Sequence, residues 1–177
     1  MKTIMIFSLI ALSLLVIISV TILIILSPGK PKPFLDYNGK ILPNSISEKL
    51  FININGSKQG LFVKSKDISN PVLLYLHGGM PDYFLTEKYP SRLEDLFTVI
   101  WWEQRNCGIS ANSGTSNHKA TIQQLIDDAI ELTKYLSRRF KKEKIYLMGH
   151  SGGTFLGVKI VEKAPELYEA YIGVAQM

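Results

Sequence analysis

The sequence predicts an α/β fold in which a mostly parallel sheet, with strands and helices alternating along the chain, follows one transmembrane helix. Three observations support this prediction. The chain opens with a long uncharged run, short apolar runs recur after it, and amphipathic helical patterns lie between those runs. Apolar runs without alternation are typical of strands buried on both faces, as in a parallel sheet. Their alternation with helices is typical of α/β proteins.

The first element is the apolar run from Ile4 to Leu26, 23 residues without a charge, a proline or a glycine. A helix of about 20 residues spans the hydrocarbon layer of a membrane. The alternative is a cleaved secretion signal, whose apolar region is shorter, about 7–15 residues, and ends in a small-residue cleavage site. Here the sequence continues LSPGKPKPF, without such a site. We therefore expect residues 1–26 to be an uncleaved, single-pass membrane anchor.

The orientation of this anchor follows from its flanks. Lys2 precedes the span, and Lys30, Lys32 and Lys40 follow it, together with Asp36. The positive-inside rule compares the basic residues on the two sides, and here they nearly balance. We expect a short cytoplasmic tail and an extracytoplasmic catalytic domain, while the opposite arrangement stays open.

Residues 27–45 hold four prolines and two glycines, a composition that predicts a linker. Residues 46–177 are enough for one domain. The net charge of +5 is spread along the chain, and the densest basic cluster, residues 138–144, closes a predicted helix, where a solvated surface is expected. No nucleic-acid-binding motif is present, so no nucleic-acid partner is expected. Cys107 is the only cysteine, which excludes an intrachain disulfide.

The predicted strands begin with a hairpin. Residues 50–55 alternate in polarity, Gly56–Gly60 reads as a turn, and residues 61–64 pair back. The strands expected to be buried on both faces are the apolar runs 72–76, 98–102, 144–148 and 170–175.

Two helices are predicted between these strands. Thr121 and Gln124 have the spacing of a capping box at the start of the first, residues 122–140. The second covers residues 152–163 and stops before Pro165. One face of the first helix is apolar and carries Ile122, Leu125, Ile126, Ala129, Thr133, Leu136 and Phe140. Its first half carries the acids that the helix dipole favours there, namely Asp127, Asp128 and Glu131.

A candidate nucleophile lies at the junction of a strand and a helix. Gly149–Gly153 has the pattern G-x-S-x-G, with Ser151 at its centre, and the apolar strand ends at Met148. A sharp strand-to-helix turn raises a serine hydroxyl to the edge of the sheet, and flanking glycines let neighbouring backbone approach. The alternative is an ordinary glycine-rich turn with an exposed serine.

A second candidate element, His77-Gly78-Gly79, follows the strand 72–76. Attack on a carbonyl creates an oxyanion, which two backbone N–H groups must stabilise. Gly152 is one candidate donor, and Gly78 or Gly79 is the other. We expect His77 to shape this loop by hydrogen bonding, because a base has no reason to precede the oxyanion glycines on the same loop.

The motifs YLHGGMPDYF, VIWWEQRNCGIS and YLMGHSGGTFL, in this order, resemble the proline-iminopeptidase-like branch of the α/β-hydrolase superfamily. The resemblance covers roughly residues 50–177 and implies the N-terminal half of an α/β-hydrolase sheet. It implies that Ser151 is the nucleophile, that Gly152, Gly78 and Gly79 form the oxyanion hole, and that no metal or organic cofactor is used. It also assigns motif-shaping positions: His77, Gly149, Gly153, Gln104 and Arg105.

The family further implies a triad Asp and His from later strands and a cap domain. Three departures from its pattern stand out: Met80-Pro81 where the family has Pro-Gly, Asn106 where it has Gly, and an end of the sequence within the sixth strand region. No histidine follows Ser151, and His118 is a loop residue. Glu162, Glu166 and Glu169 lie on or beyond the second helix, away from the serine.

The sequence therefore predicts a serine hydrolase that cleaves peptide, amide or ester bonds through an acyl-enzyme. Residues 46–177 are expected to be a partial domain, without cap or C-terminal strands, and to be inactive alone. In a complete form, the partner would be a small peptide or ester substrate, and the anchor would contact the membrane. The alternatives are a decayed, non-catalytic remnant and a membrane-tethered binding module.

Overall fold

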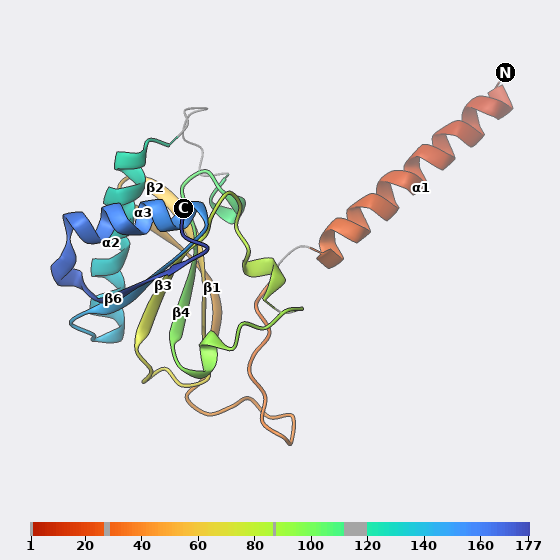
Figure 1. Ribbon diagram of the computed structural model, residues 1–177. Helices are drawn as coiled ribbons and strands as arrows, with labels where there is room; N and C mark the ends of the chain where they lie inside the picture. Colours follow the sequence, from red (N-terminus) through yellow and green to blue (C-terminus); the bar gives the residue numbers. More distant parts are fainter. Residues whose placement is uncertain (1, 27–28, 87, 112–119) are drawn as a thin grey trace. The chain divides into compact units, whose positions relative to one another are not determined.

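The computed structural model describes residues 2–26, 29–86, 88–111 and 120–177 (Figure 1). The chain forms two compact units, residues 1–30 and residues 31–177. The expected boundary of the domain at residue 46 thus differs from that of the second unit, which already begins at Pro31.

The first unit contains one helix, α1 (Lys2–Leu26). Its part Met5–Ile25 is long and apolar enough to cross a membrane, a property that an N-terminal signal sequence shares. Three hydroxyls on this helix, of Ser13, Ser19 and Thr21, donate to the carbonyl oxygen four residues earlier, at 2.8–2.9 Å. Their polar groups are therefore paired within the helix, as a lipid environment requires.

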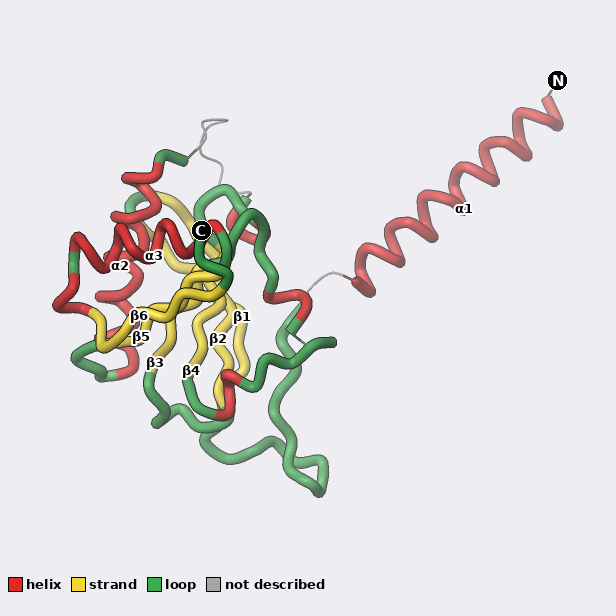
Figure 2. The backbone as a smooth tube through the Cα atoms, in the orientation of Figure 1, coloured by secondary structure: helices red, strands yellow, loops and turns green. Residues whose placement is uncertain are grey.

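The second unit is built on one six-stranded sheet with the order β1-β2-β4-β3-β5-β6 (Figure 2). The strands are β1 (Ile46–Ile54), β2 (Ser57–Ser65), β3 (Val72–Leu76), β4 (Thr98–Glu103), β5 (Ile145–His150) and β6 (Tyr168–Val174). β1, β2 and β4 pair antiparallel, while β4, β3, β5 and β6 pair parallel. The predicted mostly parallel sheet is confirmed for its β4–β6 side, and the hairpin forms the other edge.

The prediction of a five-residue turn in the hairpin is wrong. Asn55 and Gly56 alone form the turn, with φ of 46° and 74°, and Ser57 already pairs with Ile54. A two-residue hairpin loop with positive φ at both positions matches the twist of the strands, and Asn-Gly is its preferred sequence. The segment Ser57–Gly60 is therefore strand, which places Gln59 in the buried interior.

Two helices cover one face of the sheet, α2 (Ile122–Phe140) and α3 (Gly152–Lys163) (Figure 1). Both match the predicted bounds, and the capping box of Thr121 and Gln124 is confirmed. The described residues of this unit also form four short 3-10 helices: Tyr83–Leu85, Leu93–Asp95, Gly108–Ser110 and Pro165–Leu167.

The core has two layers because alternate side chains of each strand point to opposite faces. Val72, Leu74 and Leu76 of β3 pack towards α2 and α3. Leu73 and Tyr75 join the opposite cluster, where loops close the face. There the ring of Tyr83 stacks on Phe62 with a centroid separation of 3.9 Å and an interplanar angle of 11°.

The basic end of α2 is less solvated than predicted. Arg139 forms an ion pair with Glu48 of β1, and the ammonium group of Lys142 donates to the Ser69 carbonyl oxygen at 2.8 Å. Lys141 ends the helix with a left-handed φ of 53°. Part of this cluster therefore ties the helix to the sheet.

Candidate active site

Ser151 lies at the turn between β5 and α3, at the C-terminal edge of the parallel sheet. Its φ of 51° and ψ of −123° lie in a sparsely populated region for a residue with a side chain, which costs about 1–3 kcal/mol. The surrounding backbone holds it there. The Ser151 N–H donates to Val174 O at 2.9 Å, and its carbonyl oxygen accepts from the Thr154 N–H at 2.8 Å and the Thr154 hydroxyl at 2.6 Å.

Gly149 and Gly153, the two outer glycines of the pattern, lie where neighbouring backbone segments are in close contact. A Cβ on Gly149 would lie 2.6 Å from the carbonyl oxygen of Gly153. A Cβ on Gly153 would lie 2.3 Å from the carbonyl oxygen of Leu76, at the end of β3. Neither position has room for a side chain, because strand, turn and helix pack backbone to backbone. The spacing of the two glycines around Ser151 thus has a steric origin.

The His77–Gly79 loop reaches the serine from the neighbouring strand. β3 and β5 are adjacent and parallel, with Leu76 opposite Gly149, so both loops leave the sheet at one edge. A Cβ on Gly78 would lie 3.0 Å from the Ser151 Cβ, and one on Gly152 would lie 4.0 Å from the Gly79 backbone nitrogen. The backbone nitrogens of Gly152 and of the Gly78–Gly79 segment thus lie beside the same serine.

His77 is buried and both of its ring nitrogens are engaged. Its Nε2 accepts from the Gln104 backbone N–H at 3.2 Å, which leaves Nδ1 to donate to Gly78 O at 2.9 Å. The Gln104 side chain also donates to the His77 carbonyl oxygen at 3.1 Å. Burial lowers the pKa of His77 from its ordinary value, which favours the neutral ring that this hydrogen-bond pattern requires. These contacts are those of a loop-shaping histidine.

His150 lies next to the serine in sequence, but its ring faces another group. Its Nδ1 lies 3.4 Å from Asp82 Oδ2, and the Tyr75 hydroxyl donates to the same oxygen at 2.9 Å. Burial, together with this bond, raises the pKa of Tyr75 above its ordinary value. Asp82 thus joins the loop after Gly79 to β3 and β5.

The Ser151 hydroxyl has one described partner, the sulfur of Met177 at 3.9 Å. Glu162 pairs with Lys159 at 2.8 Å on α3, and His118 lies outside the described residues. Within the described part of the chain, the serine is therefore brought together with backbone N–H groups but with no histidine or carboxylate that could serve as its general base.

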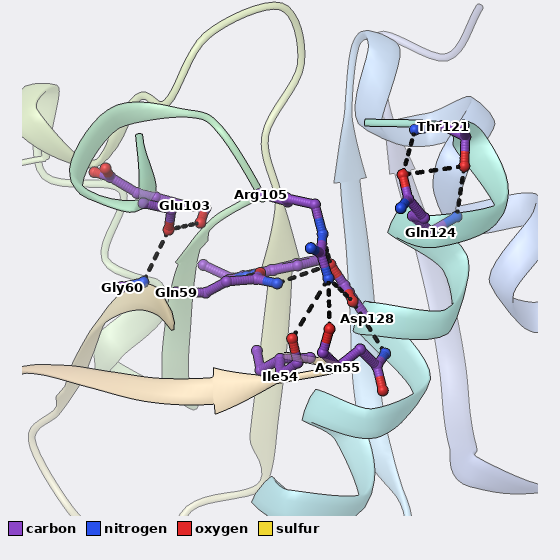
Figure 3. A network of polar contacts seen from close by, with 11 residues as sticks. Ile54, Asn55, Gln59, Gly60, Glu103, Arg105, Thr121, Gln124 and Asp128 are labelled. Carbon is purple, nitrogen blue, oxygen red and sulfur yellow. Dashed lines mark hydrogen bonds and ion pairs between the residues drawn. The ribbon is translucent and has the colours of Figure 1, made fainter. Parts of the chain in front are cut away.

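Asp128 is a buried acid beside the predicted motif residue Arg105, and the sequence did not single it out. Its fully buried carboxylate accepts from Arg105 Nε at 2.7 Å and from a terminal Arg105 nitrogen at 2.8 Å (Figure 3). Gln59 donates to it at 2.7 Å, and Asn55 at 3.0 Å. The hydrogen bonds from Arg105 to Asp128, together with the charge of Asp128, raise the pKa of Arg105. Helix α2, the hairpin turn and the loop after β4 thus meet at one carboxylate.

Gln104 and Arg105, two of the predicted motif-shaping residues, therefore contact different parts of the chain. Gln104 binds the His77 loop, whereas Arg105 binds Asp128 and the Ile54 and Asn55 carbonyl oxygens (Figure 3). Asn106, which follows them, has a φ of 64°. Asparagine tolerates this left-handed conformation better than most residues with a side chain, so it can stand where the family has glycine.

Comparison with known proteins gives similarities over this same region. A sequence model of the family described as serine aminopeptidase, S33, matches residues 69–177. The probable aminopeptidase YbaC of Bacillus subtilis (strain 168) is 38% identical over 128 residues, which are 71% of this chain and 40% of that protein. The chain thus spans about 40% of the length of the curated relative that it matches.

Solved structures share the fold. The epoxide hydrolase VrEH1 from Vigna radiata superposes with a TM-score of 0.59 at 22% identity, over 72% of this chain and 39% of that one. A proline iminopeptidase-related protein from Thermus thermophilus gives a TM-score of 0.58 at 22% identity, over 72% and 44%. At these identities the likeness concerns the architecture of the sheet and its helices.

Proposed function

Because the chain belongs to the serine aminopeptidase S33 family of α/β-hydrolases, we propose that it carries the nucleophile and oxyanion hole of a serine hydrolase. Its substrates would be peptides, as the name of its aminopeptidase relative suggests, or other amides or esters that the same acyl-transfer chemistry can cleave. The observation that carries this proposal is the strained Ser151 backbone, held between β5 and α3 against the Gly78 loop.

In the proposed reaction, Ser151 Oγ attacks the carbonyl carbon of the substrate. A C–O bond forms, and the π electrons of the carbonyl move to its oxygen. The N–H groups of Gly152 and of Gly78 or Gly79 stabilise this oxyanion, an effect worth about 3–4 kcal/mol per donor in a comparable hydrolase. The oxyanion then collapses, the bond to the leaving amine or alcohol breaks, and the acyl group stays on Ser151 until water hydrolyses the ester.

The proton of Ser151 needs an acceptor, which the described histidines do not provide. His77 has both ring nitrogens engaged, and the His150 ring faces Asp82. We propose that a histidine and its orienting acid come from the part of the family fold that these 177 residues do not span, and that the histidine takes this proton and returns it to the leaving amine or alcohol. Without them, a serine hydroxyl is a weak nucleophile at neutral pH.

The test is labelling by a fluorophosphonate, which reacts with activated serines. The protein would be isolated from the membranes of its own cells, labelled, and digested with trypsin. Cleavage after Lys144 and Lys159 releases residues 145–159, in which Ser151 is the only serine. We expect the adduct on this peptide and its loss in Ser151→Ala. An unlabelled folded protein, beside a labelled family member, would refute the proposal.

The alternative is a membrane-tethered binding module, and the absence of a described base near Ser151 favours it. The same experiment separates the two. A binding module would remain unlabelled yet hold a partner saturably, and Ser151→Ala would leave that binding unchanged.

We also propose that α1 is a membrane anchor and that the catalytic domain is extracytoplasmic. The length and composition of Met5–Ile25 and its internally paired hydroxyls support an anchor. A retained anchor keeps the protein in membranes washed with alkaline carbonate, whereas a cleaved signal leaves a shorter, extractable chain. Protease digestion of intact cells reports on the side of the membrane.

A further inference from the structure

Residues 34–42, here called the 34–42 loop, form a small hairpin that projects from the second unit (Figures 1 and 2). Leu35 and Ile41 form an antiparallel bridge. The Leu42 N–H donates to Phe34 O at 2.8 Å, and the Asp36 N–H donates to Lys40 O at 2.7 Å. The loop therefore has a defined backbone conformation of its own.

This loop exposes three large side chains that the core does not use. Leu35 is 56% exposed, Ile41 is 65% exposed and Tyr37, at the tip, is 96% exposed. Scattered apolar side chains are normal on protein surfaces, but three of them within seven residues of one projecting hairpin form a local apolar tip. An exposed apolar tip of this kind indicates that the loop binds another surface.

Several backbone N–H groups of the tip are paired within the loop. Asp36 Oδ1 accepts from the Asn38 N–H at 2.8 Å and from the Lys40 N–H at 2.9 Å, and the Gly39 N–H donates to Asp36 O at 3.0 Å. Backbone groups that leave water without partners carry a large cost. Because these N–H groups keep their partners, they add little to the cost of moving the tip into the headgroup region.

The base of the loop is fixed to the sheet. The Lys64 ammonium of β2 lies 4.9 Å from the centre of the Phe34 ring, and the Ser47 hydroxyl of β1 donates to Lys32 O at 2.7 Å. The apolar tip is thus held on a rigid support, which reduces the entropy lost when it binds a surface.

We propose that the 34–42 loop inserts Leu35, Tyr37 and Ile41 into the headgroup region of a lipid bilayer. This inference rests on the proposed membrane anchor. Eight residues lie between Leu26, the end of α1, and Leu35, which makes nine Cα–Cα steps. They can span at most about 30 Å at 3.3–3.6 Å per residue, so the loop cannot lie far from the bilayer surface. Tyrosine is enriched at membrane interfaces.

The charges around the tip fit the same surface. Lys30, Lys32 and Lys40 flank or belong to the loop and are exposed. The only acid of the loop, Asp36, already accepts two N–H groups. Lysines beside an apolar tip are attracted to anionic headgroups, so phosphatidylglycerol or phosphatidylserine should strengthen the contact.

The test uses the full chain in vesicles of phosphatidylcholine and phosphatidylglycerol, with a Tyr37→Trp substitution. Bromine atoms on the acyl chains quench an indole that reaches them. Trp101 and Trp102 are 4% and 1% exposed and supply a constant background. The matched control is Val158→Trp on α3, which is 42% exposed in the native protein and lies outside the loop. We expect about twofold greater quenching for Tyr37→Trp, because an interfacial indole lies beside the acyl boundary.

A second variant tests the charges, and the outcomes separate the two proposals. Replacing Lys30, Lys32 and Lys40 with glutamine should remove the difference in quenching between anionic and purely zwitterionic vesicles. Release of the chain by alkaline carbonate would overturn the anchor proposal. Retention with equal quenching of Tyr37→Trp and Val158→Trp would overturn the loop proposal alone. A blue-shifted but unquenched Tyr37→Trp emission, the signature of a protein occupant, would also overturn it.

Discussion

Removal of the Asp128 carboxylate is the substitution with the largest effect expected from the structure. Its side chain is fully buried and accepts hydrogen bonds from Arg105, Gln59 and Asn55. In Asp128→Ala, the Arg105 guanidinium, on a side chain that is 13% exposed, would keep its charge and lose its ion-pair partner. The side-chain amide group of Gln59 would lose its acceptor as well.

The magnitude follows from the buried charge that is left behind. Breaking a buried ion pair by removing one partner costs about 3–5 kcal/mol. A domain of this size has a total stability of about 5–15 kcal/mol, so the variant would be close to unfolding. The matched control is the adjacent Asp127→Ala. Asp127 pairs with Lys163, and both side chains are nearly half exposed, so water screens that pair and its loss costs at most about 1 kcal/mol.

The assay is urea unfolding of the full chain in detergent, followed by tryptophan emission. Trp102 reports on the network directly, because its indole N–H donates to Gln59 Oε1 at 2.9 Å. If Asp128→Ala does not fold, the double variant Arg105→Met with Asp128→Leu, which removes both charges, should recover a cooperative transition. Equal free energies of unfolding for Asp128→Ala and Asp127→Ala would refute the claim that Asp128 holds α2, the hairpin turn and the loop after β4 together.

Two further predictions concern the site itself. Gly153→Ala should abolish fluorophosphonate labelling and lower the thermal midpoint, since its Cβ would lie 2.3 Å from Leu76 O. Gly79→Ala, whose Cβ has no atom within 4 Å, should leave the midpoint unchanged, and similar midpoints for both would contradict the steric argument. For His77, burial holds the folded pKa below the ordinary 6.5, so its stabilising contribution is present above pH 6.5 and is lost as the pH falls through the folded pKa. His77→Asn should flatten the midpoint-against-pH curve on the acid side, and an unchanged curve would exclude this origin.

Much of the fold could be predicted because its elements have strong local signals. The run 72–76 matches β3 residue for residue, and the bounds of α2 and α3 match those predicted from periodicity, capping and Pro165. The predicted turn at Gly56–Gly60 is too long because this polar, glycine-flanked stretch has the composition of a turn, although Ser57 already pairs with Ile54. Burial of Gln59 depends on Asp128, a contact across 69 residues that local pattern cannot reveal.

The candidate site, too, could be predicted from the sequence only in part. Ser151, Gly78 and Gly152 could be placed from motifs, because strand ends of adjacent parallel strands meet at one edge. Asp128 was read as one of several acids that suit the helix dipole. The sequence does contain an indication that Asp128 is buried. It lies three residues after Leu125 and four before Leu132, and therefore near the apolar face of the helix. Its ion pair with Arg105 depends on the tertiary structure.

The Asp128 cluster also sets an order of events during protein synthesis. It joins residues that lie 73 and 69 positions apart, and a ribosome adds about 5–20 residues per second, so Asp128 follows the hairpin by roughly 4–15 s. During that interval the contacts with the Asp128 carboxylate cannot yet hold the hairpin edge of the sheet. The apolar segment at residues 5–25 is made long before, so the membrane insertion that we propose for it would begin before the Asp128 contacts can form.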